Sequence, residues 1–269
     1  MLKELIYNYF EAQQRESNYT EREKLYFSPS SLTACKRQLF YKYTDTQASN
    51  PISTHAYIKM QMGTTIHAEI EKILKEIGIY ELGEELKTGS INDVDMRYRV
   101  DGLLRIDDKA YVFELKTVYA SGYNTIEREP KKDHIIQLLS YMIIEKIDTG
   151  ILLYIGRDNG FMVEYKVEIK NNELLINSVY KTEILKEFYN LIAELEKIKD
   201  NINNNILPER DYKRVFKNYK GELSEDFTKD KVKYKSDWQC SYCKWKDLCY
   251  QDILENMKDS NFYIGGEYE

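Results

Sequence analysis

The sequence predicts an α/β fold, with a core of strands and helices that carries helical and cysteine-rich additions. Two observations lead to this prediction. Apolar residues at helical spacing alternate along the chain with runs of strand character, and three cysteines cluster near the C-terminal end. With 269 residues, the chain has ample length to bury a core as one large domain or two small ones.

Helices are predicted where apolar residues recur every three or four positions or where a start signal occurs. Ser28-Pro29-Ser30-Ser31 is such a start signal, and Gly78 caps a run that contains Ile66 and Ile70. The helices expected on these grounds span residues 1–28, 32–43, 62–77, 134–147 and 174–200.

Strands are predicted where short apolar runs flank turn residues. Asp107-Asp108-Lys109 separates one pair of runs, and Arg157-Asp158-Asn159-Gly160 separates a second pair. The strands expected on these grounds span residues 99–106, 110–118, 151–155 and 161–169.

Composition and charge exclude several classes of protein. The hydrophobic share of 42% rules out a disordered chain, and 12 Gly and 4 Pro rule out a collagen-like one. The formal net charge of −6 argues against a general nucleic-acid coat protein but permits a local basic groove. We find no signal peptide and no run of about 20 apolar residues, so we expect a cytoplasmic protein without a membrane span. Cysteines there more often bind metals than form disulfides.

The sharpest local signal is a pair of carboxylates on the first predicted hairpin. If residues 107–108 form a two-residue loop, Asp101 lies opposite Glu114, and opposed residues of antiparallel strands share a face. Lys116 shares that face because side chains alternate along a strand. Two carboxylates and an ammonium therefore converge on one spot.

This group suits a hard divalent cation, Mg²⁺ or Mn²⁺, because such ions prefer oxygen ligands and keep waters for chemistry. Lys116 would orient or help deprotonate a metal-bound water. The alternative is an exposed, salt-bridged sheet face, and the spacing of the residues alone leaves both interpretations open.

Two further polar features lie on predicted helices. His67 ends a Gly63-x-x-x-His67 segment beside an apolar stripe, where a histidine either packs, faces solvent or binds a metal. Gln137 and Tyr141 are four residues apart and share one helix face within an apolar run. They form either a satisfied pair in the core or a pair that reaches a phosphate or the metal's water.

In chain order these features are G-x-x-x-H, D, E-x-K and Q-x-x-x-Y, between about residues 63 and 141. This order resembles the RecB-like branch of the PD-(D/E)XK nuclease superfamily, whose core is a mixed central sheet flanked by helices. One departure is that Tyr98-Arg99-Val100 stands where the family commonly has a glycine before its aspartate. The resemblance implies catalytic roles for Lys116, Glu114, Asp101, Gln137 and Tyr141, and metal binding by His67, Asp101, Glu114 and the Leu115 carbonyl. Within this set Lys116 would position the attacking water, while Gln137 and Tyr141 would hold the site and the DNA backbone.

The four cysteines divide into one and three. Cys240, Cys243 and Cys249 form a C-x2-C-x5-C cluster, and Cys35 is the remaining one. A single Cys₄ site would hold zinc or an iron–sulfur cluster, and buried reduced thiols are the third interpretation. Zinc sites more often come as two close C-x2-C pairs, so the split fits a zinc ribbon less well.

The split resembles the iron–sulfur nucleases, namely the CRISPR-associated RecB-like exonucleases (the fourth numbered Cas family) and the AddB-type nuclease domains. Ser30-Ser31-Leu32 and Leu207-Pro208 extend the resemblance to about residues 28–250. It implies a 4Fe-4S cluster on Cys35, Cys240, Cys243 and Cys249 that pins both flanks of the core. The expected organisation is one nuclease unit, 1–269, with a helical part at 1–60, a RecB-like core at 61–200 and a basic, cysteine-rich part at 201–269.

DNA contacts are expected from basic and aromatic residues, chiefly in 208–235, where nine Lys and Arg stand against six Asp and Glu. The candidates are Lys131, Lys132, Arg210, Lys213, Arg214, Lys217, Tyr212 and Trp238. The alternative is a solvated, lysine-rich surface. No P-loop motif occurs in the sequence, so no motor activity is expected.

Together, the residues and the resemblance imply a Mg²⁺- or Mn²⁺-dependent DNA exonuclease acting on single-stranded DNA. The implied partners are DNA and either CRISPR integrase proteins or a phage or bacterial recombination or replication complex. The competing hypothesis is a non-catalytic DNA-binding or adaptor protein that keeps the fold and cluster. The intact residues His67, Asp101, Glu114 and Lys116 argue against it.

Overall fold

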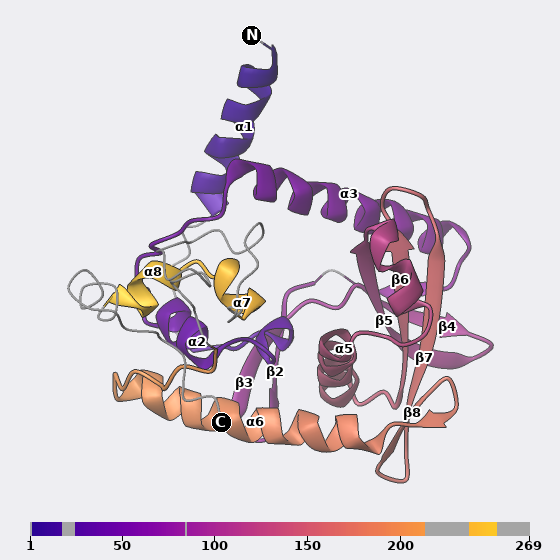
Figure 1. Ribbon diagram of the computed structural model, residues 1–269. Helices are drawn as coiled ribbons and strands as arrows, with labels where there is room; N and C mark the ends of the chain where they lie inside the picture. The colour runs from indigo at the N-terminus through magenta and orange to yellow at the C-terminus, as the bar shows by residue number, and fades with distance from the viewer. Residues whose placement is uncertain (1, 18–24, 84, 213–236, 252–269) are drawn as a thin grey trace. The chain divides into compact units, whose positions relative to one another are not determined.

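The computed structural model describes residues 2–17, 25–83, 85–212 and 237–251 (Figure 1). The chain divides into two compact units, the first formed by residues 1–33 and 53–197 and the second by 34–52 and 198–269. These units are defined by compactness. The functional division at residues 60 and 200 stays a prediction.

The first unit is built on a mixed sheet, which in the described part of the chain has seven strands in the order β1-β4-β5-β6-β7-β8-β9. β5 and β6 are parallel, and the other neighbouring pairs are antiparallel. The strands are β1 Tyr80–Leu82, β4 Gly102–Ile106, β5 Lys109–Val118, β6 Thr149–Gly156, β7 Met162–Lys170, β8 Glu173–Ile176 and β9 Val179–Tyr180. A mixed α/β core is thus confirmed.

A separate two-stranded ribbon joins β2 Lys87–Ile91 to β3 Val94–Tyr98. Phe27 pairs with Met96 of β3 through an isolated bridge, and both side chains are buried. The short elements between the larger ones are 3₁₀ turns η1 Pro29–Ser31 and η2 Ala120–Gly122 and helix α4 Tyr123–Ile126.

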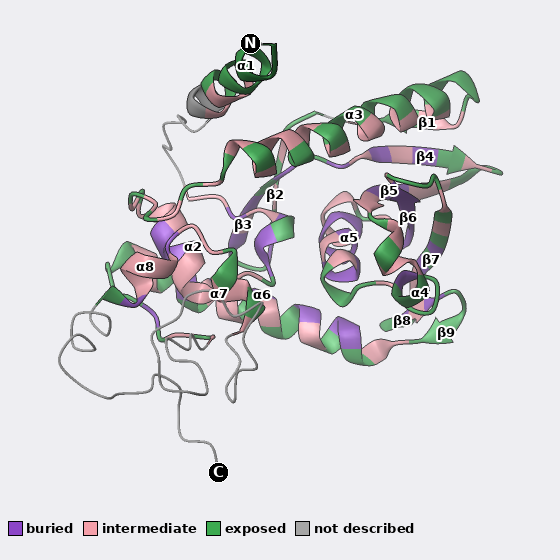
Figure 2. Ribbon diagram, turned by 45° about the horizontal axis from the view of Figure 1, so that its top comes forward, coloured by how far each residue is buried: buried purple, intermediate pink, exposed green. Residues whose placement is uncertain are grey.

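Helix α3 (Thr54–Glu76) packs its apolar stripe on β4, β5 and β6 but buries none of its residues fully. Helix α5 (Lys132–Glu145) is largely buried beside β5 and β6 (Figure 2). α5 comes close to β6 because Gly150 has no side chain: a Cβ there would lie 2.9 Å from Met142 Sδ and 3.0 Å from Leu138 Cδ2. This close approach sets the height of α5 above the strands that carry the carboxylates.

The predicted helices near the N-terminus differ from those found. Helix α1 spans Leu2–Ser17, and Phe27 is extended, so the helix predicted over 1–28 is too long. The start signal at Ser28 produces a 3₁₀ turn, because Ser31 Oγ donates to Ser28 O at 2.7 Å; helix α2 then begins only at Lys36 (Lys36–Tyr43). α3 begins earlier than predicted, because Ser53 caps its first turn by accepting from Ala56 N.

The helix predicted over 174–200 begins instead at Thr182 (α6, Thr182–Asn203), after β8 and β9. Two pairs of residues with positive φ, Asn171-Asn172 and Asn177-Ser178, form the tight turns that allow these strands. The strand pairs predicted at 99–118 and 151–169 are confirmed as β4–β5 and β6–β7.

The second unit has a small apolar core. Phe40, Tyr41 and Trp245 form one buried cluster, and Leu39, Ile198 and Tyr250 are buried as well. Trp245 Nε1 donates to Thr46 O at 2.8 Å. Two short helices carry the clustered cysteines, α7 Trp238–Ser241 and α8 Lys246–Cys249. No helix in the described part of the chain combines the length and the apolar character that a membrane crossing needs.

Candidate functional site

The β4–β5 hairpin brings the two predicted carboxylates together. Asp107 and Asp108 have φ of 48° and 59°, as in a type I′ turn, and the ladder runs from Ile106↔Lys109 to Gly102↔Phe113. The predicted two-residue loop and register are therefore confirmed. Asp101, one residue beyond the ladder, accepts a hydrogen bond from Leu115 N on Oδ2 at 2.8 Å.

α3 brings His67 to the same place. His67 Nδ1 lies 3.2 Å from Asp101 Oδ1, and the two side chains are 28% and 26% exposed. Burial alone would lower the pKa of His67, but the hydrogen bond and charge of Asp101, helped by the charge of Glu114, raise it above its ordinary value.

Glu114 is buried beneath this pair, with 2% of its surface exposed. Its Oε1 lies 2.6 Å from Lys116 Nζ. Burial and the negative charge of Asp101 raise the pKa of Glu114 to about 7, against the opposing effects of Lys116 and His67. The site therefore holds an acid whose charge the fold tolerates poorly.

A hydrogen-bonded chain continues from Lys116 to α5. Lys116 Nζ donates to Gln137 Oε1 at 2.8 Å, and Gln137 Nε2 donates to Tyr141 OH at 2.9 Å. Burial raises the pKa of Tyr141, so its phenol stays protonated. The ring of Tyr98 stacks on that of Tyr141 with centroids 5.8 Å apart. The structure thus brings the predicted polar residues of the first unit into one connected group.

The donor chemistry fits a hard divalent cation, because two neighbouring carboxylates and the Leu115 carbonyl offer oxygen ligands. In the described part of the chain, however, no three His, Cys, Asp or Glu side chains are arranged to hold a metal ion. His67 is engaged with Asp101, and Glu114 with Lys116. Metal binding at this site requires some of these side chains to rotate out of their present pairs.

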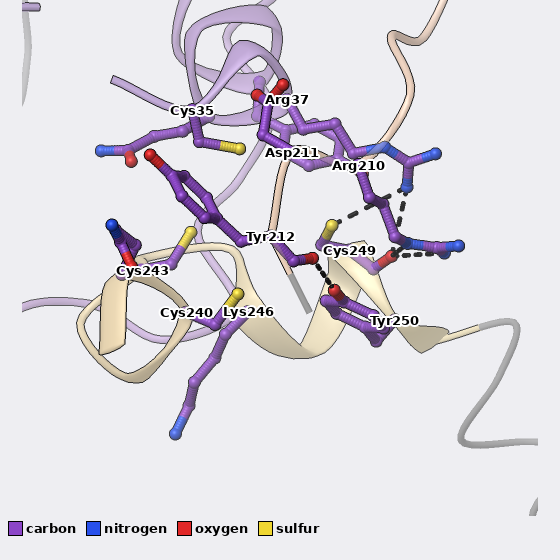
Figure 3. Close-up of a pocket in the computed structure, with 13 residues that line it drawn as sticks. Cys35, Arg37, Arg210, Asp211, Tyr212, Cys240, Cys243, Lys246, Cys249 and Tyr250 are labelled. Carbon is purple, nitrogen blue, oxygen red and sulfur yellow. Dashed lines mark hydrogen bonds between the residues drawn. The ribbon is translucent and has the colours of Figure 1, made fainter. Parts of the chain in front are cut away.

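The four cysteines line a single cavity within the second unit (Figure 3). The cavity encloses about 410 Å³ of empty space, part of it open to solvent. None of the four cysteines forms a disulfide, and each is half-buried. Burial raises the pKa of Cys35 to about 11 and that of Cys240 to about 12. Two N–H groups point at sulfur: Trp245 N at 3.4 Å from Cys243 Sγ, and Arg37 Nη1 at 3.7 Å from Cys249 Sγ.

This donor set fits a cofactor that binds thiolates, since N–H···S contacts stabilise the charged form of sulfur. Among the described residues no three His, Cys, Asp or Glu side chains are arranged to hold a metal ion. The choice between zinc and a polynuclear iron–sulfur cluster therefore stays a prediction from the sequence.

The predicted DNA contacts lie in different settings. Lys132 Nζ bonds Glu187 Oε2 at 2.9 Å, and Lys131 N donates to Tyr154 OH at 3.1 Å. Arg210 and Tyr212 line the cysteine cavity, whereas Trp238 is 66% exposed. Lys213, Arg214 and Lys217 lie outside the described residues.

His134 and Tyr154 support the site, although the sequence pattern did not point to them. Tyr154 is fully buried on β6, directly beside Lys116 in the β5–β6 ladder, and its hydroxyl lies 2.9 Å from His134 Nδ1. These contacts fix the first turn of α5, one turn before Gln137. The position of His134 three residues before Gln137 was the available signal, since both lie on one helix face.

His134 gives the protein a pH-dependent stability. Burial lowers its pKa to about 4; Asp133 opposes this effect, whereas Lys116 and Lys131 reinforce it. The unfolded chain therefore binds the proton more tightly, and stability that is present above pH 6.5 is lost as the pH falls. Between pH 7 and 4.5 we expect this loss to be about 2 kcal/mol. Urea unfolding at both pH values should show a smaller loss in the His134→Gln variant; an equal loss would refute the assignment.

Neither family models nor curated proteins match this sequence. Among solved structures, the crystal structure of SSO0001 is similar to this chain, with a TM-score of 0.50 and 16% sequence identity. The alignment covers 94% of this chain and 96% of SSO0001. An alkaline exonuclease (LHK-Exo) from Laribacter hongkongensis has a TM-score of 0.46 at 15% identity, over 67% of this chain and 91% of its own. The complex of LHK-Exo with dAMP scores 0.47 at 16% identity over the same shares. The similarity to SSO0001 shows a shared fold, and the two lower scores carry no inference.

Proposed function

We propose that this chain is a metal-dependent deoxyribonuclease whose active site is the group around Asp101 and Glu114. The observation that carries the proposal is the buried Glu114 carboxylate, held beside Asp101 at a cost in stability that a bound cation would offset. Functional sites are where such strained electrostatics are found. An ion pair with a purely structural role would not need Asp101 beside the buried Glu114.

Each residue has a role in the proposed reaction. Asp101, Glu114 and the Leu115 carbonyl would hold Mg²⁺ or Mn²⁺, with His67 as a further ligand once it turns from Asp101. When bound, the metal supplies Lewis acidity and lowers the pKa of a water molecule. Lys116 orients that water and stabilises negative charge at the phosphate.

The α5 residues act through Lys116. Gln137 accepts from its ammonium at 2.8 Å, which restricts the ammonium to one position. Tyr141, protonated because it is buried, donates to the site or to the DNA backbone. Gln137 and Tyr141 are therefore proposed as positioning residues for the reaction.

We further propose that the cysteine cavity holds a 4Fe-4S cluster on Cys35, Cys240, Cys243 and Cys249. The shared cavity and the N–H···S contacts support this choice. The sequence pattern adds single-stranded DNA as the substrate, hydrolysis from an end, and a role in CRISPR spacer acquisition or in phage or bacterial recombination. Integrase proteins or a recombination complex would be the partners.

The test is an assay on labelled single-stranded, circular single-stranded and duplex DNA, with Mn²⁺ or with EDTA. We expect Mn²⁺-dependent cleavage of linear single strands, lost in Asp101→Asn. This variant keeps the acceptor for Leu115 N and removes the charge. The matched control is Asp108→Asn in the turn of the same hairpin, where asparagine tolerates the positive φ. Absence of cleavage by the wild type, or equal cleavage by both variants, would overturn the proposal and favour a non-catalytic DNA-binding protein.

A further inference from the structure

Two arginines meet at the last cysteine of the cavity. Arg37 Nη1 donates to the Cys249 carbonyl at 3.3 Å and approaches its sulfur at 3.7 Å (Figure 3). Arg210 donates to the same carbonyl from Nε at 3.2 Å and from Nη2 at 2.8 Å. Both guanidinium groups therefore converge on one residue.

The same arginines tie together three segments of the second unit. Arg37, two residues after Cys35, also donates from Nε to Pro208 O at 2.7 Å. Arg210 stacks over the ring of Tyr250, with its Cζ 4.7 Å from the centroid, and Tyr250 OH donates to Tyr212 O. These contacts join the start of α2, the segment 208–212 and the end of α8.

The charges of the two arginines have a second consequence. Among the described residues Arg37 forms no ion pair with a carboxylate, and its Nη1 lies 3.7 Å from Cys249 Sγ. A thiolate at Cys249 would bind this guanidinium more strongly than a neutral thiol, because hydrogen bonds from a guanidinium to an anion are about twice as strong as neutral ones.

We propose that Arg37 and Arg210 form a guanidinium clamp that raises the reduction potential of the cluster and holds Cys249 in place as a ligand. This inference rests on the proposed cluster. Its physical basis is that an electron added to the cofactor increases the negative charge next to Arg37, so the clamp stabilises the reduced state more than the oxidised one.

The test measures the midpoint potential of anaerobically purified full-length protein by titration with dithionite, followed by visible absorbance. We expect Arg37→Gln to lower the ratio of reduced to oxidised cluster at a fixed potential about tenfold, a shift of 59 mV for one electron. Arg37→Lys keeps the positive charge but loses the planar guanidinium with its several N–H donors, so its shift in potential should be smaller. Lys42→Gln, on the same helix but outside the cavity lining, is the matched control and should leave the potential unchanged.

The outcomes separate the clamp from the cluster itself. Wild-type protein without iron and labile sulfide overturns the proposed cluster, and the clamp with it. Iron-loaded Arg37→Gln with an unchanged or higher potential overturns the clamp alone. If Arg37→Gln loses iron while its far-UV circular dichroism is preserved and Lys42→Gln stays loaded, the result supports the proposal that the clamp holds Cys249 as a ligand. In that case the effect on the midpoint potential is measured with Arg37→Lys.

Discussion

The Glu114→Gln variant is expected to lose about 10³-fold in metal-dependent cleavage while gaining stability. The loss follows because a neutral amide neither attracts the divalent ion nor balances Lys116, and metal catalysis supplies several kcal/mol of the barrier reduction. The gain follows because Glu114 is buried beside Asp101, and burial together with that charge outweighs the pairing with Lys116. We expect the metal-free variant to be about 1 to 2 kcal/mol more stable than the wild type at pH 8.

The measurement combines initial cleavage rates in Mn²⁺ with urea unfolding in EDTA. The matched control is Glu168→Gln, a glutamate on β7 that pairs with Lys109 and Lys166, each at 3.2 Å. It should keep its activity and change stability by less than about 1 kcal/mol, as is usual for ion pairs near the surface. A destabilised and active Glu114→Gln would identify Glu114 as a structural ion-pair partner and remove it from the reaction.

The position of the candidate site could be predicted from the sequence, because the register of the hairpin is a local property. Two aspartates that accept positive φ fix the turn, and counting along the strands then places Asp101 near Glu114. The hydrogen-bond partners of these side chains could not be predicted from the sequence. Lys116 and Gln137 are 21 residues apart, and their contact depends on α5 lying close above Gly150.

The errors in the helix and strand boundaries arise where two local structures compete. Residues 173–180 contain apolar positions that fit either a helix or two short strands. The residues at 171–172 and 177–178 have positive φ and form turns, so the segment between and after them folds as strands. Ser28 begins a turn that the next residues do not extend into a longer helix, because the Ser31 hydroxyl donates a hydrogen bond to Ser28 O. The contact of Arg37 with Cys249 could not be predicted for a different reason, because the two residues are 212 positions apart in the sequence.

Removing the proposed cluster is expected to unfold the second unit and leave the first intact. The described buried apolar residues of the second unit are few, and a small core gains stability from a cofactor. They are Leu39, Phe40, Tyr41, Ile198, Trp245 and Tyr250. Cofactor binding of this kind contributes on the order of 10 kcal/mol to folding. Both tryptophans of the chain, Trp238 and Trp245, belong to this unit, so their fluorescence reports on it alone.

The measurement follows tryptophan emission and far-UV circular dichroism while a chelator removes iron. Trp238 is already 66% exposed and Trp245 only 7%, so a red shift of the emission maximum reports the opening of the core around Trp245. The dichroism should largely persist, because the sheet belongs to the first unit. Adding iron and sulfide should reverse the shift, whereas Mg²⁺ or Mn²⁺ should not, which separates the cluster from the nuclease site. Unchanged emission from iron-free protein would mean that the contacts of Trp245 and the arginines hold this unit together without a cofactor.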